Sequence, residues 1–276
     1  NSGTFTNGGV VRIGEGTFFG NNRDTPFSTP AAVGVYITEA GRGTLIDGTF
    51  DNRGSVWNEG TIAVRTTGTY TQSPSSSGLA ATTRNASTFQ NEGRVSLSGS
   101  SSFFNTSQYI QLASGTTGIG GTLVNLSGLV FNAGTITVGT RGEYIQNRLP
   151  LPGDRLPTTL NIGTFTNAGN TLINGGIFTN QGSVVNSGTW QIAPHGTATF
   201  ANQGSTVNSG IFEVATRGQV TGNGSYLQNA AGAQTIVNGT FAHTISLQAG
   251  SLSGTGIITG TVTNTGGVSS EPNSKT

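Results

Sequence analysis

The chain has 276 residues, of which 45 are glycine and only 8% are charged, and its formal net charge is +1. This composition excludes a helical bundle, because glycine weakens helices, and it excludes the basic surface that nucleic acid requires. The sequence has no apolar run of about 18 residues, which predicts that no helix spans a membrane. It also contains no cysteine, so we expect an extracellular or cell-surface location, where a free thiol is a liability.

The N-terminal part of the chain already shows a pattern that repeats later. Residues 1–5 have the same local pattern as residues 186–190, which predicts that the sequence opens in the middle of a repeating coil. A segment with two prolines, residues 20–34, interrupts the pattern and is expected to be a loop. Strands are expected next, at 35–38 and 44–46.

The middle of the chain contains two further interruptions, at 73–87 and 148–160. Their prolines cannot donate hydrogen bonds to a strand ladder, so we expect loops there as well. All three loops follow the same place in the repeat, and insertions at one corner of a solenoid stack along one edge. Both a composite binding edge and simple tolerance of insertions at this corner agree with the pattern.

The clearest repeat consists of residues 178–199 and 200–221, two copies of a 22-residue unit with 12 identical positions and no gap; residues 50–71 are a third copy. Apolar residues recur at every second position, which is the period of a strand. A stacked repeat of this kind predicts an all-β parallel solenoid of about 22 residues per coil and roughly ten coils. We expect one body over residues 1–276, ending in a polar tail at 269–276. The expected inward apolar residues include Phe178, Val184, Trp190, Ile192, Phe200, Phe212 and Val214.

Two asparagines in each clear copy fall on the apolar side of the strands. A buried amide is costly unless it forms hydrogen bonds, and stacked coils solve this when each Asn bonds the equivalent Asn one coil above and below. We therefore predict an asparagine ladder, with exposed turns as the alternative position for these residues. The ladder residues are Asn52, Asn58, Asn180, Asn186, Asn202 and Asn208.

No motif in the sequence predicts a catalytic residue, a cofactor site or a metal site. An enzyme that acts on polysaccharides needs clustered carboxylates, and the best approach to a cluster is Asp47 and Asp51 with Glu92 from an adjacent coil. The two histidines, His195 and His243, lack the spacing of metal ligands and are expected in turns or on the surface. We therefore expect a protein that is not an enzyme.

The repeat contains characteristic sequence motifs. They include Gly-Thr-Phe-Thr-Asn at residues 163–167 and Leu-Ser-Gly-Thr-Gly-Ile-Ile-Thr-Gly-Thr-Val-Thr-Asn-Thr-Gly at residues 252–266. These motifs resemble those of the β-helical passenger regions of bacterial autotransporter-type adhesins and related exported surface proteins. The resemblance covers most of the chain outside the three loops. It implies a right-handed parallel β-helix on bacterial cells or in their matrix, and it carries over no catalytic residue.

The two ends of the sequence are complementary in the repeat register. Residues 262–269 match the first part of the unit and residues 1–5 match the part that comes next. This predicts a fibre or matrix subunit that polymerises head to tail with copies of itself. The alternatives are an adhesin that binds surface glycans or another partner through its stacked loops, and a polysaccharide-acting β-helix enzyme. The residues expected at the junction are Asn1, Ser2, Gly3, Thr4, Phe5, Val262, Asn264, Gly266, Val268 and Ser269.

Overall fold

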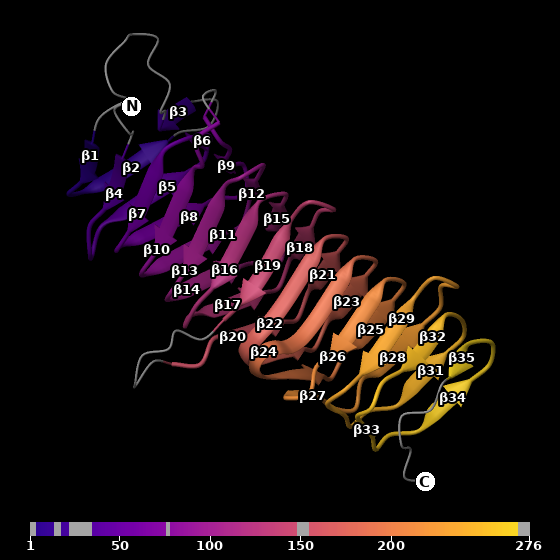
Figure 1. Ribbon diagram of the computed structural model, residues 1–276. Helices are drawn as coiled ribbons and strands as arrows, with labels where there is room; N and C mark the ends of the chain where they lie inside the picture. Colours follow the sequence, from indigo (N-terminus) through magenta and orange to yellow (C-terminus); the bar gives the residue numbers. More distant parts are fainter. Residues whose placement is uncertain (1–3, 14–17, 22–34, 76–77, 148–154, 270–276) are drawn as a thin grey trace. The chain divides into compact units, whose positions relative to one another are not determined.

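The computed structural model describes residues 4–13, 18–21, 35–75, 78–147 and 155–269. All regular elements in this part of the chain are β-strands, and the strand pairs are parallel (Figure 1). The predicted all-β solenoid is therefore confirmed. No helix among the described residues has the length and apolar character needed to cross a bilayer. The chain divides into two compact units, residues 1–136 and 137–276; that they form one body stays a prediction.

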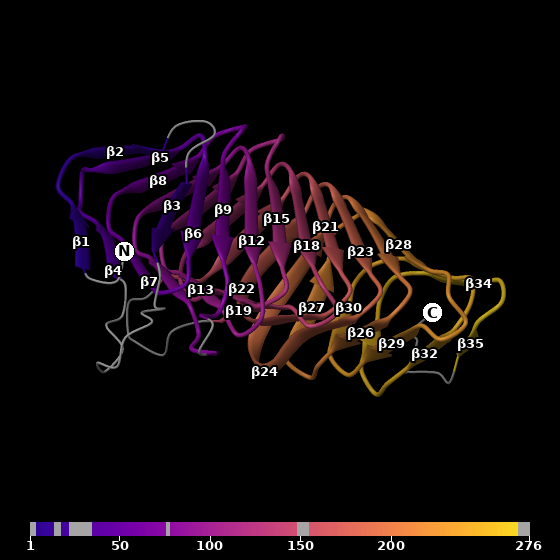
Figure 2. The same cartoon turned by 90° about the horizontal axis from the view of Figure 1, so that it is seen from above.

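In the first unit the strands form three columns, and each coil contributes one strand to each column. Strands of one column lie side by side, as the third column shows clearly in Figure 2. The first column is β1 (Thr4–Asn7), β4 (Val35–Thr38), β7 (Ser55–Asn58), β10 (Thr82–Asn85), β13 (Ser102–Asn105) and β16 (Thr122–Asn125). The second is β2 (Val10–Ile13), β5 (Gly43–Ile46), β8 (Thr61–Val64), β11 (Thr88–Asn91), β14 (Gln108–Gln111) and β17 (Leu129–Asn132). The third is β3 (Phe18–Asn21), β6 (Thr49–Asn52), β9 (Thr69–Gln72), β12 (Arg94–Leu97) and β15 (Thr116–Ile119).

The second unit also has three columns, and β18 (Thr135–Val138) lies where the chain passes from one unit to the other. One column is β19 (Glu143–Gln146), β22 (Asn170–Asn180), β24 (Thr189–Asn202), β26 (Ile211–Val214), β29 (Gln234–Val237), β32 (Ser251–Ser253) and β35 (Val268–Ser269). The long strands β22 and β24 also enter the next column, with β20 (Thr158–Asn161), β27 (Gly218–Thr221), β30 (Thr240–Phe241) and β33 (Ile257–Ile258). The last column is β21 (Thr164–Asn167), β23 (Ser183–Asn186), β25 (Ser205–Asn208), β28 (Ser225–Gln228), β31 (Ile245–Leu247) and β34 (Val262–Asn264).

The core of each unit is a continuous stack of inward side chains. The seven apolar residues predicted to face inward between Phe178 and Val214 are all fully buried, which confirms the strand period. In the second unit Trp190 packs against Phe178 and Phe200, with ring centroids 5.1 and 5.5 Å apart. In the first unit Phe50 and Tyr70 stack at 5.2 Å. These separations are typical of favourable aromatic pairs.

The coils differ in length around the expected value of about 22 residues. Asn180 bonds its equivalent Asn202, 22 positions on, whereas Asn105 bonds its equivalent Asn125, 20 positions on. Near the C-terminal end the step is shorter still, because Thr240 pairs with Ile257. Parallel pairing preserves only the direction of each side chain, so residues are added or lost at the turns.

The expected loop ranges, 20–34, 73–87 and 148–160, extend too far into neighbouring strands. Strand β3 continues to Asn21, β10 occupies 82–85 and β20 begins at Thr158. Residues 22–34, 76–77 and 148–154 lie outside the described residues, as do 270–276 of the expected tail. The common edge for the three loops stays a prediction.

Glycine is required where successive coils approach most closely. A Cβ atom at Gly204 would overlap the carbonyl oxygen of Gly182 in the preceding coil. Gly176 would clash with Pro157 in the same way, and it also adopts a positive φ of 71°, a conformation that favours glycine. The high glycine content is therefore a property of the turns between stacked strands.

Replacing Phe200 by Ala should lower the free energy of unfolding by ~3–5 kcal/mol, because the ring is fully buried and its cavity cannot collapse between fixed coils. Ile177→Ala is the control, since Ile177 is 43% exposed in the same column; its effect should stay within about 0.5 kcal/mol. Chemical denaturation followed by circular dichroism measures both. Equal effects of the two substitutions would contradict the assignment of the core.

Candidate functional site

The predicted asparagine bonds are present in the second unit. The Asn180 side chain donates from Nδ2 to Oδ1 of Asn202 at 2.8 Å, and Asn186 donates in the same way to Asn208 at 2.8 Å. All four side chains are buried, which excludes the alternative that they lie in exposed turns. The bonds join residues 22 positions apart in the chain, so each one holds two successive coils together.

Each ladder amide makes a second bond, which the sequence pattern does not predict. Asn180 Nδ2 also donates to the carbonyl oxygen of Ser205 at 2.9 Å, and Asn186 Nδ2 donates to that of Ile211 at 2.8 Å. Both carbonyls belong to the first residue of the strand that follows the turn. One amide therefore stabilises the equivalent amide and the corner of the next coil at the same time.

The first unit has a ladder of the same kind in its first column. Asn58 donates to Asn85 at 2.7 Å, Asn85 to Asn105 at 2.8 Å and Asn105 to Asn125 at 3.1 Å. Asn52 differs from the other predicted ladder residues, because its Nδ2 donates to Gln72 Oε1 and Thr83 Oγ1, both at 3.4 Å, and to the carbonyl oxygen of Thr82 at 3.3 Å. It is buried and bonded, but no asparagine follows it in its column.

The ladders have a direction. In every bond described above the earlier coil supplies the N–H donor and the later coil supplies the oxygen acceptor. The side-chain oxygens of Asn58, Asn91 and Asn167, each at the start of a ladder, are buried without a hydrogen-bond partner. In the preceding coil the register places Thr38 beside Asn58 and Val64 beside Asn91. The unpaired atom at the start of each of these ladders is therefore an acceptor, buried inside the stack.

Buried groups of tyrosine, threonine and glutamine are a second element of the interior, and sequence reasoning missed them. All five tyrosines of the chain donate to or accept from a threonine hydroxyl at 2.5–2.7 Å. In four groups the threonine donates onward to the glutamine that stands two residues after the tyrosine. The four groups are Tyr70–Thr83–Gln72, Tyr109–Thr117–Gln111, Tyr144–Thr159–Gln146 and Tyr226–Thr235–Gln228.

The sequence signal for these groups is Tyr-x-Gln, at residues 70–72, 109–111, 144–146 and 226–228. The period of two places both side chains on the inner face. The threonine comes from a later strand, 6 to 13 residues after the glutamine. This variable distance hides the partnership from a search for repeats of fixed length.

The carboxylates that were candidates for catalysis are engaged separately. Asp47 accepts a hydrogen bond from Arg12 Nε at 3.0 Å. Asp51 pairs with Arg53 at 2.9 Å and accepts from the hydroxyl of Thr71 at 2.9 Å, while Glu92 accepts from Gln90 at 2.9 Å.

The register also separates these carboxylates. Asp47, Arg65 and Glu92 follow successive strands of the second column, because the Arg65 amide bonds Ile46 and the Glu92 amide bonds Val64. Arg65 therefore lies in the coil between the two acids, and Asp51 belongs to the third column. No group of three or more acidic, histidine or cysteine side chains with metal-binding geometry occurs among the described residues.

The two histidines have different environments. His195 is exposed within β24, as expected. His243 lies in the bend after β30, which agrees with the expected turn, but its side chain is only 3% exposed and is therefore not at the surface. The register places His243 two coils after Asn202, and the intervening residue is Gly222, which has no side chain. The His243 ring fills this space; Nε2 lies 3.5 Å from Asn202 Nδ2, and Nδ1 lies 2.8 Å from the carbonyl oxygen of Thr244.

Most of the residues expected at the assembly junction are exposed where the structure describes them. Phe5 is 36% exposed and Val268 is 72% exposed. Asn264 is exposed and bonded within its own turn, with Nδ2 donating to Gly267 O at 3.0 Å. Val262 is half-buried, and Gly266 and Ser269 are exposed. Asn1, Ser2, Gly3 and the side chain of Thr4 lie outside the described residues.

A scan against models of known protein families finds no match to this chain, and a search of curated protein sequences finds none either.

Replacing Asn186 by Ala should lower the free energy of unfolding by about 1–3 kcal/mol, because it removes the bonds that Asn186 makes with the buried amides of Asn167 and Asn208. Gln181→Ala is a matched control, since Gln181 donates to Gln203 across the same coils at 3.1 Å but in solvent. Its loss should stay below about 0.5 kcal/mol. Urea unfolding of both variants tests the ladder; equal losses would contradict it.

Stability should fall at high pH, because burial raises the pKa of all five tyrosine hydroxyls. The unfolded chain loses these protons near pH 10, whereas the folded chain keeps them. Below about pH 9, tyrosine ionisation should therefore leave the free energy of unfolding unchanged. Above about pH 10 the free energy of unfolding should decrease, by at most about 1.4 kcal/mol per pH unit for each tyrosine.

Absorbance of tyrosinate at alkaline pH measures this effect directly. The native protein should show no tyrosinate signal until it unfolds, and the urea-unfolded protein should titrate with an ordinary tyrosine pKa. A native protein that titrates reversibly like the unfolded chain would contradict the burial of the tyrosine hydroxyls.

Proposed function

We propose that this chain is an extracellular structural protein of a bacterial surface or matrix, a subunit that adds head to tail to copies of itself. The function is mechanical and positional, and no step of covalent chemistry belongs to it. The resemblance of the repeat to exported β-helical passenger regions supports the location. The absence of cysteine from the sequence is consistent with an oxidising exterior.

The direction of the amide ladders is the observation that carries the proposal. Each coil that carries a ladder amide donates to the following coil and accepts from the preceding one, so two such coils are complementary in a single orientation. A contact between unlike faces of identical subunits generates a filament when the rotation from one subunit to the next does not close into a ring. An unpaired edge strand of one copy can form the same parallel hydrogen bonds with a strand of another copy that successive coils form within a unit.

The exposed strands β34 and β35 provide the surface for this contact. Within the described chain β35 pairs on one side with β32, and β34 pairs on one side with β31. Val268 on β35 is an apolar residue at 72% exposure, which a neighbouring copy would bury. In the register Asn264 pairs with Leu247, which is buried in the preceding coil, so Asn264 occupies an inward-facing position of its column.

Assembly is tested on the chain of residues 1–276 by sedimentation velocity and electron microscopy over a range of concentrations. We expect filaments whose length increases with concentration. Val268→Lys places a charge on the edge strand and should leave folded monomers, because a lysine on an edge opposes strand addition. Deletion of residues 262–276 should have the same effect.

Ile211→Lys is the matched control, because Ile211 is an exposed isoleucine in the middle of the second unit, on β26. Filaments should persist in this variant. A wild-type chain that stays monomeric at high concentration, or filaments that Val268→Lys does not disrupt, would overturn the proposal.

A further inference from the structure

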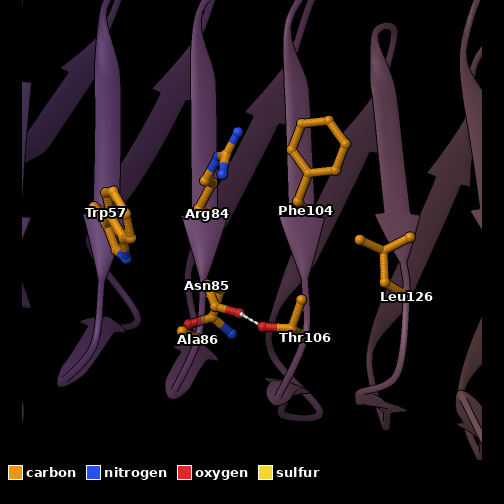
Figure 3. Close-up of a pocket in the computed structure, with 7 residues that line it drawn as sticks. All are labelled: Trp57, Arg84, Asn85, Ala86, Phe104, Thr106 and Leu126. Carbon is orange, nitrogen blue, oxygen red and sulfur yellow. Dashed lines mark hydrogen bonds between the residues drawn. The ribbon is translucent and has the colours of Figure 1, made fainter. Parts of the chain in front are cut away.

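The outer face of the first unit carries an exposed aromatic and cationic hollow of about 330 Å³, built by side chains of four successive coils (Figure 3). Trp57 lies on β7, Arg84 on β10 and Phe104 on β13, and Leu126 directly follows β16. Below this row, Asn85, Ala86 and Thr106 complete the lining (Figure 3). Asn85 also belongs to the ladder of the first column, whereas none of the junction residues discussed above lines the hollow.

The parallel register aligns the three large side chains in one row across the strands. Trp57 pairs with Arg84, and Arg84 pairs with Phe104. Neighbouring strands are about 4.8 Å apart, so the two aromatic positions are separated by about 10 Å with the guanidinium position between them. That separation is comparable with the length of two sugar rings in a linear polysaccharide.

The row is exposed although the interior of the same unit is filled with aromatic rings. Trp57 is 47% exposed, Arg84 is exposed and Phe104 is half-buried. By contrast Trp190, the other tryptophan of the chain, is completely buried. A contiguous exposed apolar patch rimmed by polar residues marks a binding site, and here Trp57, Phe104 and Leu126 line one hollow.

The scaffold under the row is rigid. Asn58, Asn85 and Asn105 follow the three row residues in sequence and form the continuous ladder with bonds of 2.7 and 2.8 Å. Thr106 is fixed by a bond from its hydroxyl to the carbonyl oxygen of Asn85 at 3.1 Å (Figure 3). A surface held in this way loses little conformational freedom when a ligand binds.

The charge of the row defines the ligand further. Arg84 forms no ion pair with any residue that the structure describes. No acidic side chain lines the hollow. The acidic residue next to it in sequence, Glu59, comes directly after β7 and is not among the lining residues. A guanidinium group recognises a carboxylate through two parallel hydrogen bonds, so the surface is complementary to an anion with flat apolar faces on both sides.

We propose that this row binds a linear acidic polysaccharide, with sugar rings stacked on Trp57 and Phe104 and a uronate carboxylate bound by Arg84. A sugar ring offers an apolar C–H face to an aromatic ring, and a uronate carries its carboxylate at the rim. An added peptide strand is excluded as the occupant, because β7, β10 and β13 are each paired on both sides and offer no free edge. One cation is too few for nucleic acid.

The test is isothermal titration of the chain of residues 1–276 with a hexamer of 1,4-linked galacturonic acid, together with tryptophan fluorescence. Binding should change the emission of Trp57, because Trp190 is shielded in the core. Arg84→Gln and Trp57→Ala should each weaken binding about tenfold, the loss expected when a charge-assisted bond or a stacked ring is removed. Using the monomeric Val268→Lys variant keeps this test independent of self-assembly.

Two controls separate the chemistry of the ligand. The methyl-esterified hexamer keeps the rings and loses the charges, and a hexamer of glutamate keeps the charges and loses the rings; both should bind about tenfold more weakly. Arg94→Gln, at an exposed arginine in the third column, should leave the affinity unchanged. Equal affinity for either control ligand, an equal effect of Arg94→Gln, or no binding at millimolar hexamer would overturn the proposal.

Discussion

The structure depends on the pairing of buried amides between successive coils. Stacking of similar units places each residue beside its own equivalent, so a buried polar side chain must be able to bond a copy of itself. An amide satisfies this requirement because it carries a donor and an acceptor on the same group. Removing a coil from the stack would leave these amides exposed to solvent or buried without a hydrogen-bond partner. Each amide left buried without a partner would lower the free energy of unfolding by about 1–3 kcal/mol. The solenoid is therefore stable as a stack and not coil by coil.

The tyrosine groups extend the same principle to larger side chains. Tyr70 alone would bury a hydroxyl among aromatic rings, and Gln72 alone would bury an amide. Thr83 joins them, since its hydroxyl is both a donor and an acceptor. The inner positions of a coil are thus constrained by their neighbours above and below. Outward positions such as Trp57 and Arg84 carry no such constraint, which leaves the outer face available for binding.

Much of the interior was predictable because strand period and stacking are local rules. The parity of Phe200 and the bonding of Asn180 follow from the spacing of residues in one repeat. The partnership of Tyr70 with Thr83 was not predictable in this way, because a turn of variable length separates them. The burial of His243 depends on Gly222 one coil earlier, and the Trp57 row depends on which coils are neighbours across the insertion before β10. Both require the register, which a single repeat does not contain.

The close contact between glycine turns has a consequence for how such a chain changes over generations. Gly204 fits against Gly182, and Gly210 fits against Gly188, so these successive coils present each other with the same surface of small residues at their turns. An in-frame duplication of residues 178–199 by unequal recombination would insert a coil that matches the surfaces on both sides. Substitution of a single turn glycine would damage two contacts at once. Gain and loss of whole coils is therefore the mode of genetic variation that this architecture tolerates best, and the length of the array can drift while its cross-section is conserved.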